Sequence, residues 1–365
     1  MAFLELENLS KAFGTYKAVD GLTLSVEKGE FVSLLGPSGC GKTTTLQMIA
    51  GFVEPSAGAI RLGAKDLLAV KPAKRGLGIV FQSYALFPHM TVAENVGFGL
   101  EMQGVAAAER TTRVGETLEL VGLGAFAARF PRQLSGGQQQ RVALGRALVA
   151  RAKVCLMDEP LSNLDAQLRQ EMRAELRELQ QRLGLTVVYV THDQAEAMSM
   201  ADQVVLLHQG RVEQCARPRD IYAQPATTFA ARFIGTPAMN IVRLQGRGIA
   251  GSDCEVAPGM VAGSAYPQLM GIRPELIAVT SDRQGVLATV QGFEYLGADL
   301  VLRCLVGTEL LTVRAPGNAH AGLEPGHSVY LQWPAMAEHW FDGQGRRIEA
   351  LSADIAEDPL ILAST

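Results

Sequence analysis

Short apolar runs separated by amphipathic stretches characterise the first 235 residues. The runs are rich in β-branched residues and lie at residues 31–35, 79–81, 154–157, 187–190 and 204–207. Continuous apolar runs of this length are typical of strands buried on both faces of a mostly parallel sheet. The clearest helical pattern covers residues 166–183, where apolar side chains recur at spacings of 3 and 4 before the stop signal of Gly184. The pattern predicts an α/β fold.

Two regions depart from this alternation. Residues from about 83 to 150 follow a helical pattern with no convincing strand, which predicts a helical lobe inserted into the sheet domain. After Gly235, short β-branched runs at 286–290, 300–305 and 328–331 are punctuated by Gly and Pro, which is typical of a small β-barrel. We therefore expect two domains, at residues 1–235 and 236–365.

Composition supports this division and excludes several classes of protein. The 365 residues are 48% hydrophobic and 19% charged, which is the balance of a folded chain. The net charge of −4 divides into +2 for residues 1–235 and −6 for the remainder. Neither part is basic enough to indicate a nucleic-acid partner. No apolar run approaches the ~20 residues that a membrane span needs, so we expect a soluble protein.

The five cysteines are odd in number and include no close pair. A disulfide framework or a zinc site is therefore not expected, and the compartment is predicted to be the cytosol.

A glycine-rich motif follows the first predicted strand and opens a helix. It matches the pattern G-x-x-x-x-G-K-[ST] of phosphate loops. Backbone N–H groups of such a loop converge on phosphate oxygens, Lys42 would reach the β- and γ-phosphates of a bound nucleotide, and the Thr43 hydroxyl would bind Mg²⁺. The predicted cofactor-binding residues of this loop are Gly36, Pro37, Ser38, Gly39, Cys40, Gly41, Lys42, Thr43 and Thr44.

A second motif is the buried strand at 154–157 that ends in two carboxylates. Asp158 is predicted to hold Mg²⁺ through water, and Glu159 to activate the attacking water as a general base. A surface or capping pair is the alternative, which the upstream phosphate loop disfavours.

The sequence Leu-Ser-Gly-Gly-Gln at 134–138 directly precedes a predicted helix. Ser135 is at least an N-cap. The other interpretation is a second anion site formed by Ser135, Gly136, Gly137 and Gln138, which has a use only if it closes over a nucleotide held by another copy of the chain.

These motifs, with Ser-Asn-Leu-Asp at 162–165 and Thr-His-Asp at 191–193, occur in the order found in the ATP-binding subunits of ABC transporters. The resemblance covers residues 1 to about 235. Gly-Ile-Arg-Pro-Glu at 271–275 looks like the C-terminal TOBE-type domain, an OB-like barrel, of importer ATPases for maltose, sn-glycerol-3-phosphate and polyamines. The join at 233–240 is similar to the sugar and glycerol-phosphate branch.

The resemblance implies further site residues. Gln82 would sense Mg²⁺ or water and link the nucleotide to the helical lobe, and Asp165 would contact a second subunit. His192 would contact the γ-phosphate and hold Glu159 and the water in line. Phe13 would stack on adenine, with Tyr16 as the nearby rival; the alternative for either ring is a place in the core.

The same resemblance implies a homodimeric ATPase on the cytoplasmic face of the inner membrane. It would drive import of a small polar solute through a separate permease, served by an extracytoplasmic solute-binding protein. A sugar or sn-glycerol-3-phosphate is favoured, and a polyamine or an organophosphonate is the alternative. A soluble ABC ATPase acting on ribosomes or DNA is a rival of another class, disfavoured by the single cassette and the absence of heptads.

Two local interpretations stay open. Cys40 is either a low-pKa thiol whose modification blocks ATP or a small residue that merely fits the loop. Residues 83–90 are either part of the surface that receives a helix of the membrane partner or, for about half of their side chains, core.

Overall fold

The structure is a computed structural model that describes residues 3–256, 267–280, 283, 285–319 and 322–348. It divides into two compact units, Met1–Ile221 and Tyr222–Thr365, here called unit 1 and unit 2. Among the residues that the structure describes, no helix is long and apolar enough to cross a bilayer. The predicted domain boundary near residue 235 lies inside unit 2.

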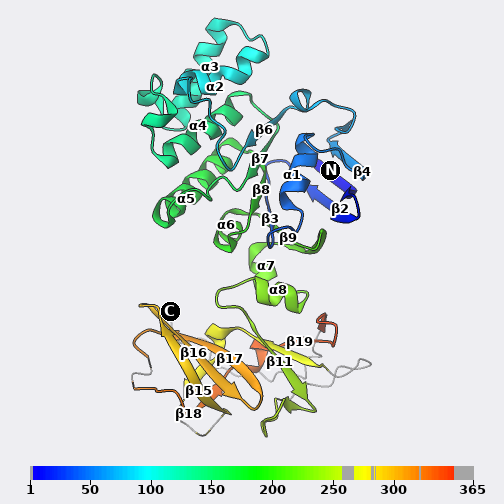
Figure 1. Cartoon of the computed structure of the whole chain (residues 1–365), viewed down its shortest axis with the longest axis vertical. Coiled ribbons are helices and arrows are strands. Elements are labelled where there is room, and N and C mark those ends of the chain that lie inside the picture. Colours follow the sequence, from blue (N-terminus) through cyan, green and yellow to red (C-terminus); the bar gives the residue numbers. More distant parts are fainter. Residues whose placement is uncertain (1–2, 257–266, 281–282, 284, 320–321, 349–365) are drawn as a thin grey trace. The chain divides into compact units, whose positions relative to one another are not determined.

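A six-stranded sheet forms the centre of unit 1 (Figure 1). Its strand order is β10-β9-β3-β8-β7-β6, and all pairs are parallel except β9 with β10. Every residue of β3 and of β8 is buried, which explains their continuous apolar runs. The bounds are β3 Phe31–Leu35, β6 Leu77–Val80, β7 Val154–Asp158, β8 Thr186–Thr191, β9 Gln203–His208 and β10 Arg211–Ala216. The predicted mostly parallel sheet is confirmed.

Helices α1, α5 and α6 accompany this sheet, with bounds Lys42–Ala50, Ala166–Leu183 and Gln194–Met200. The structure confirms the predicted helix 166–183 at both ends. Asp165 caps its N-terminus, and Gly184 ends it in the left-handed conformation with φ 59°. Met172, Leu176 and Leu179 form its buried stripe.

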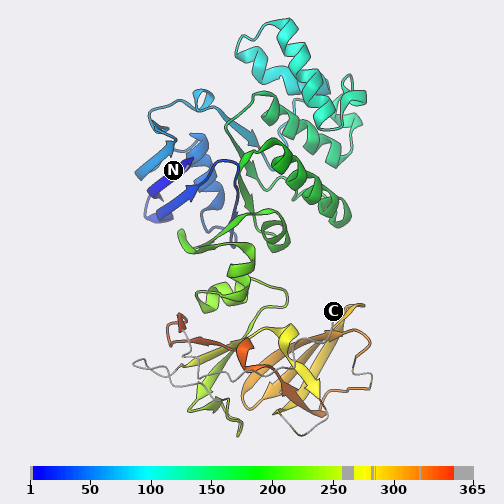
Figure 2. The same cartoon turned by 180° about the vertical axis from the view of Figure 1, so that it is seen from behind.

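The predicted helical lobe is confirmed as well. Residues 81–153, all of which the structure describes, contain no strand. They form α2 (Val92–Met102), α3 (Ala107–Leu120) and α4 (Gly136–Val149), with 3₁₀ turns at Gly124–Phe126 and Pro131–Gln133. The lobe has its own core, to which each helix contributes, for example Val96, Leu118 and Val142. Figure 2 shows the lobe as a separate layer beside the sheet.

A four-stranded antiparallel sheet at the N-terminus is absent from the predicted elements. Its order is β2-β1-β4-β5, with bounds β1 Leu4–Phe13, β2 Tyr16–Val26, β4 Ala57–Leu62 and β5 Lys65–Asp66. The alternation of Leu22, Leu24 and Val26 was the signal that could have revealed it. Residues Pro72–Lys74 form a 3₁₀ turn before β6.

Unit 2 contains two antiparallel five-stranded sheets in the orders β12-β11-β13-β19-β20 and β14-β18-β15-β16-β17. Both sheets contribute to one core, which includes Met270 and Trp340 from the first sheet and Val290 and Leu302 from the second. This barrel-like arrangement confirms the predicted fold of the tail. Its strands are β11 Asn240–Gln245, β12 Gly248–Ile249, β13 Leu269–Ile272, β14 Ala278–Thr280, β15 Val286–Tyr295, β16 Asp299–Val306, β17 Glu309–Pro316, β18 Ser328–Gln332, β19 His339–Phe341 and β20 Arg347–Ile348.

The remaining helices are short. Helix α7 covers Pro218–Ala223 and α8 covers Thr228–Phe233, and 3₁₀ turns occur at Pro274–Leu276 and Ala335–Ala337.

Arg273 fastens the first segment of unit 2 to its barrel. The guanidinium is buried and donates to the backbone carbonyls of Tyr222 (2.8 Å), Ala231 (3.2 Å) and Ile234. It also lies over the Tyr222 ring, 4.0 Å from the centroid. These contacts explain why residues 222–235 belong to unit 2.

We predict that Arg273→Met destabilises unit 2 by about 3 kcal/mol, because three carbonyls lose a charged donor in a buried place. Denaturant unfolding followed by the fluorescence of Trp333 and Trp340, the only tryptophans and both in unit 2, would measure the change. The exposed Arg303→Met is the matched control, for which we expect a change within about 0.5 kcal/mol. Equal stability of the two variants would contradict this role of Arg273.

Candidate functional site

The phosphate loop joins β3 to α1. Helix α1 begins after Gly41, which has φ 100° and provides no side-chain cap, so the first N–H groups of the helix are open to a ligand. Gly36 and Gly41 are held tightly: a Cβ atom there would lie 2.4 Å from the carbonyl oxygens of Leu207 and Ala18. The loop is therefore a cradle in which only glycine fits at both ends.

Lys42 lies inside this loop and is only 6% exposed. Its Nζ donates to the carbonyl oxygens of Gly36 (2.8 Å) and Pro37 (2.9 Å). An ammonium held at the open end of a helix by neutral carbonyls is well placed to exchange them for phosphate oxygens.

Thr43 connects the loop to the end of β7. Its hydroxyl donates to Asp158 Oδ1 at 3.0 Å. Burial raises the pKa of Asp158, and the nearby Glu159 adds to this, against the opposing effects of Thr43 and Lys42. A carboxylate that pays this cost of burial favours a cation beside it.

Glu159 follows Asp158 in an unusual backbone conformation. Its φ is 43°, which is uncommon for a residue other than glycine, and its N–H donates to Val190 O at 3.0 Å. The turn directs its side chain to His192: Nδ1 lies 2.9 Å from Glu159 Oε2. Strained residues of this kind concentrate at functional sites.

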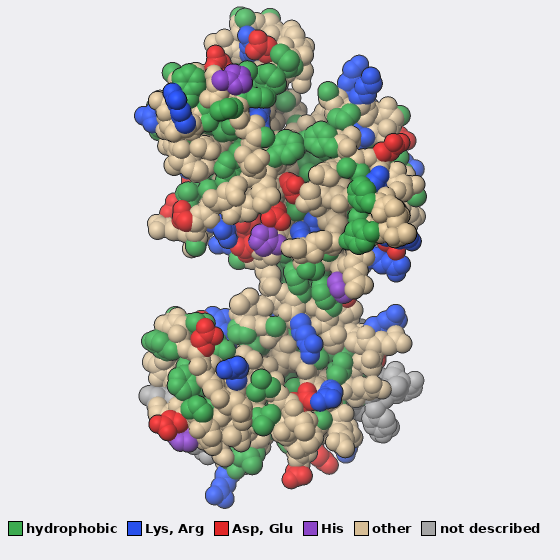
Figure 3. Space-filling view, in the orientation of Figure 1, with side chains coloured by type: hydrophobic (Ala, Val, Ile, Leu, Met, Phe, Trp, Pro, Cys, Tyr) green, Lys and Arg blue, Asp and Glu red, His purple; other side chains and the backbone are tan. Residues whose placement is uncertain are grey.

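The structure thus brings together five predicted residues from three parallel strands: Lys42 and Thr43 after β3, Asp158 and Glu159 at β7, and His192 after β8. Parallel strands place such ends at one edge of the sheet. Figure 3 shows acidic side chains gathered beside a histidine on the visible face of unit 1.

Gln82 is exposed in the turn after β6. Because β6 pairs in parallel with β7, its end is adjacent to that of β7. Asn163 Nδ2 donates to Gln82 O at 2.8 Å, and Ser162 Oγ donates to Glu159 O at 2.8 Å. The segment 162–163 therefore bridges Gln82 and Glu159, a role that the sequence did not reveal for these two residues.

Ser135 is the N-cap of α4, which is the simpler of the two interpretations of the motif at 134–138. Ser135 Oγ accepts from the N–H of Gln138, and Gln138 Oε1 accepts from the N–H of Ser135 at 2.9 Å. Gly136 and Gly137 pack against Leu164 and Leu168, which flank Asp165. The predicted intersubunit residues therefore form one neighbourhood in the fold, while their contact with another copy stays a prediction.

Phe13 and Tyr16 face each other across the turn of the β1–β2 hairpin. Both rings are exposed, Phe13 by 52% and Tyr16 by 59%. Lys11 Nζ lies 5.1 Å from the Phe13 centroid, and the Tyr16 hydroxyl donates to Gly39 O at 2.9 Å. Because both rings are this exposed, neither belongs to the core.

Burial raises the pKa of the Cys40 thiol, which is 3% exposed and lies 3.8 Å from Lys42 Nζ. The structure therefore favours a small residue that fits the loop over a reactive thiol.

Residues 83–90 are partly core. Tyr84 is buried, and Arg146 donates to the carbonyls of Tyr84 (2.7 Å) and Ala85 (2.6 Å). Ser83, Ala85, Pro88 and His89 are exposed, so the segment is not wholly core, and its contact with a membrane partner stays a prediction.

A group near the site that sequence reasoning missed is the buried Glu196. The hydroxyls of Tyr189 (2.8 Å) and Thr191 (2.6 Å) donate to its Oε2, and burial raises its pKa. Thr191 Oγ1 also accepts from the N–H of Asp193 at 2.9 Å, so this network fixes the backbone on both sides of His192.

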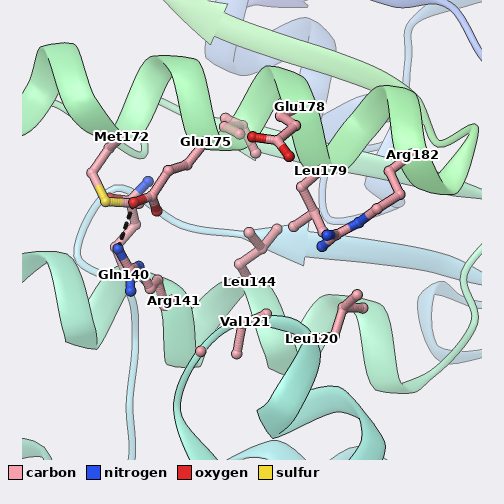
Figure 4. A pocket seen from close by; sticks show the side chains of 12 residues that line it. Leu120, Val121, Gln140, Arg141, Leu144, Met172, Glu175, Glu178, Leu179 and Arg182 are labelled. Carbon is pink, nitrogen blue, oxygen red and sulfur yellow. Dashed lines mark hydrogen bonds and ion pairs between the residues drawn. The ribbon is translucent and has the colours of Figure 1, made fainter.

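A cavity of about 230 Å³ lies elsewhere, between α4, α5 and the end of α3 (Figure 4). Arg141 and Glu175 form an ion pair of 2.7 Å on its wall. It contains none of the predicted site residues.

The fold and the cradle define a P-loop nucleotide-binding protein with an inserted helical lobe. Comparisons give the family: residues 19–162 match the ABC transporter family and residues 270–341 match the TOBE domain.

Two relatives match over nearly the full length. The sn-glycerol-3-phosphate import ATP-binding protein UgpC 2 of Agrobacterium fabrum is 43% identical over 96% of this chain and 95% of its own. The spermidine/putrescine import ATP-binding protein PotA of Thermobifida fusca is 46% identical over 90% of this chain and 91% of its own.

Solved structures agree. A dimeric ATP-binding cassette in a post-hydrolysis state, bound to ADP and Pi, is 34% identical with a TM-score of 0.53 over 59% of this chain and 99% of its own. CbiO1 of Clostridium perfringens, part of an ABC transporter complex, is 31% identical with a TM-score of 0.57 over 61% of this chain and 91% of its own. The chain belongs to the ABC transporter ATP-binding family and is an ATPase.

We predict that Asp158→Asn stabilises the nucleotide-free protein at pH 7. The raised pKa means that ionisation of Asp158 opposes folding, and this penalty grows as the pH rises above the ordinary value of 3.8. Asn keeps an acceptor for Thr43 without the charge. Melting temperatures should therefore show a gain at pH 7 that shrinks towards pH 4.

Asp20→Asn is the control, for which we expect the opposite sign: a loss of melting temperature at pH 7. The reason is that Arg211 and Lys17 lower the pKa of Asp20, so its ionised form favours folding. A melting temperature of Asp158→Asn below that of the parent at pH 7 would contradict the argument.

Proposed function

We propose that this chain energises the import of a small polar solute through a separate membrane permease, with sn-glycerol-3-phosphate or a sugar favoured. The observation that carries the ATPase part is the convergence of Lys42, Thr43, Asp158, Glu159 and His192 at one sheet edge. The transport part rests on the full-length likeness to import ATP-binding proteins.

Each residue at this edge has a chemical task. Lys42 and the open backbone N–H groups at the start of α1 bind the phosphates of ATP. Glu159 accepts a proton from the attacking water. His192 is hydrogen-bonded to Glu159 and holds Glu159 and the water in line with the γ-phosphate.

The Thr43 hydroxyl and Asp158 fit a magnesium ion. No cluster of three His, Cys, Asp or Glu that could hold a metal occurs among the described residues, and Mg²⁺ commonly binds through one or two protein oxygens plus substrate phosphates. Bound there, Mg²⁺ would neutralise charge on the β- and γ-phosphates. Gln82 is the third residue of the proposed magnesium site, where it would sense this ion or its water.

The other site residues complete a composite site. Phe13 stacks on adenine with its exposed face. Ser135, Gly136, Gly137, Gln138 and Asp165 contact the nucleotide of a second copy, so the working form is a homodimer with two ATPs. The dimeric cassette among the solved relatives supports this.

The proposed partners are the permease, which meets the exposed residues of segment 83–90, and indirectly an extracytoplasmic solute-binding protein. The location is then the cytoplasmic face of the inner membrane. A polyamine is the second candidate solute, supported by the 46% identity to a spermidine/putrescine import protein, and an organophosphonate is a further one.

We predict that Glu159→Gln lowers kcat for ATP by about 10²- to 10⁴-fold while ATP binding survives, because the amide cannot accept the proton of the attacking water. The variant should also persist as a dimer in Mg²⁺ and ATP on size-exclusion chromatography, since it loses a negative charge near the γ-phosphate.

Lys42→Ala is the control for this experiment. It removes the charge that faces the phosphates, so it should lose ATP binding and show no ATP-dependent dimer. Hydrolysis by Glu159→Gln at a near-parental rate would contradict the role of Glu159 as general base and would assign water activation to His192.

The transport proposal is tested by co-purifying the chain with its membrane partner and binding protein from its own cell. Mass spectrometry of ligands released from the binding protein should identify glycerol phosphate or a sugar. A polyamine would favour the second candidate, and co-purification with ribosomes in place of a permease would overturn the proposal.

A further inference from the structure

The two ends of the phosphate loop and its crest are held in different ways. Gly36 and Gly41, at the ends, are buried and packed against backbone carbonyls. At the crest, Ser38 and Gly39 are exposed, and a Cβ atom on Gly39 would meet nothing within 4 Å. Packing therefore fixes the ends of the loop but leaves the crest to hydrogen bonds.

The crest is tied to the hairpin by one side chain. The Tyr16 hydroxyl donates to Gly39 O at 2.9 Å. Tyr16 begins β2 and is paired in register with Phe13, the last residue of β1. Residues directly opposite in an antiparallel pair lie on the same face, a few ångströms apart.

This geometry joins both ends of the nucleotide site. Phe13 faces the base in the proposed function, and Gly39 belongs to the loop that faces the phosphates. The hairpin end that carries the stacking ring therefore also carries the hydroxyl that holds the loop crest.

We propose that Tyr16 is a positioning residue for nucleotide binding: its hydroxyl latches the crest of the phosphate loop to the hairpin that presents Phe13. This inference rests on the proposed function, since it assumes that the loop binds phosphate. Tyr16 acts through Gly39 and is not itself a stacking residue. The latch holds the loop in its binding conformation before the nucleotide arrives, so the ordering cost of binding falls.

The proposal separates Tyr16 from Phe13 by the ligand that each affects. Without the latch, the crest must be ordered on binding, and a net hydrogen bond of this kind corresponds to about 3- to 10-fold in affinity. Tyr16→Phe should weaken ATP and inorganic tripolyphosphate alike by this factor. Phe13→Ala should weaken ATP but leave tripolyphosphate unchanged, because that probe has no base.

Isothermal titration calorimetry with Mg²⁺ would measure both affinities, and steady-state assays would give KM and kcat. For Tyr16→Phe we expect a raised KM for ATP with kcat at saturation within about twofold of the parent, because chemistry occurs after the loop is ordered. Tyr295→Phe, which removes the hydroxyl of a tyrosine of similar exposure (65%) in unit 2, is the matched control and should match the parent.

Tripolyphosphate binding by Tyr16→Phe at the parental affinity would overturn the proposal, whether or not ATP binding changes. A loss confined to ATP would assign Tyr16 to the base and likewise overturn the latch. Failure of the parent protein to bind either ligand is a different result, because it contradicts the proposed function and not the role of Tyr16 alone.

Discussion

The hydrogen bond from Thr43 to Asp158 is the contact on which the candidate site depends. It joins residues that are 115 positions apart in the sequence. The bond exists because β8 lies between β3 and β7, and α1 packs across both β7 and β8. Any change in strand order would separate the phosphate loop from the carboxylates. The parallel sheet is thus the device that gathers local motifs into one site.

The site is built at a cost to local stability. Burial raises the pKa of Asp158, Glu159 has a positive φ, and the buried Lys42 ammonium donates to the backbone carbonyls of Gly36 and Pro37. A sequence selected for stability alone would avoid all three features. Their presence at one sheet edge is the physical sign of a site that a ligand of opposite charge completes.

Sequence patterns predicted the elements whose signals are local. The strand at 31–35 is a buried apolar run, and the helix at 166–183 has a capping Asp165 and a terminating Gly184. The N-terminal sheet was not predicted, because the apolar alternation of β1 shifts at Asn8, where φ is 46° and the register with β2 is irregular.

Contacts between distant segments could not be predicted in this way. Tyr16, in the N-terminal sheet, reaches Gly39 after β3, and Asn163 reaches Gln82 after β6, only because the tertiary fold brings these separate segments together. The boundary between the units differs from the predicted one near residue 235 for the same reason. Residues 222–235 belong to unit 2 because Arg273, 39 positions after Ile234, donates hydrogen bonds to their carbonyls.

The capping box of α4 clarifies how one motif can have both of its predicted roles. Ser135 accepts from the N–H of Gln138, the third residue of the helix. The amides of Gly136 and Gly137 precede that position and are among the four that a helix leaves unpaired. A cap therefore does not use up the anion-binding end of α4, and the exposed Gly136 leaves its amide open to approach. The N-cap observed in one chain and the anion site proposed for a second copy are compatible in one structure.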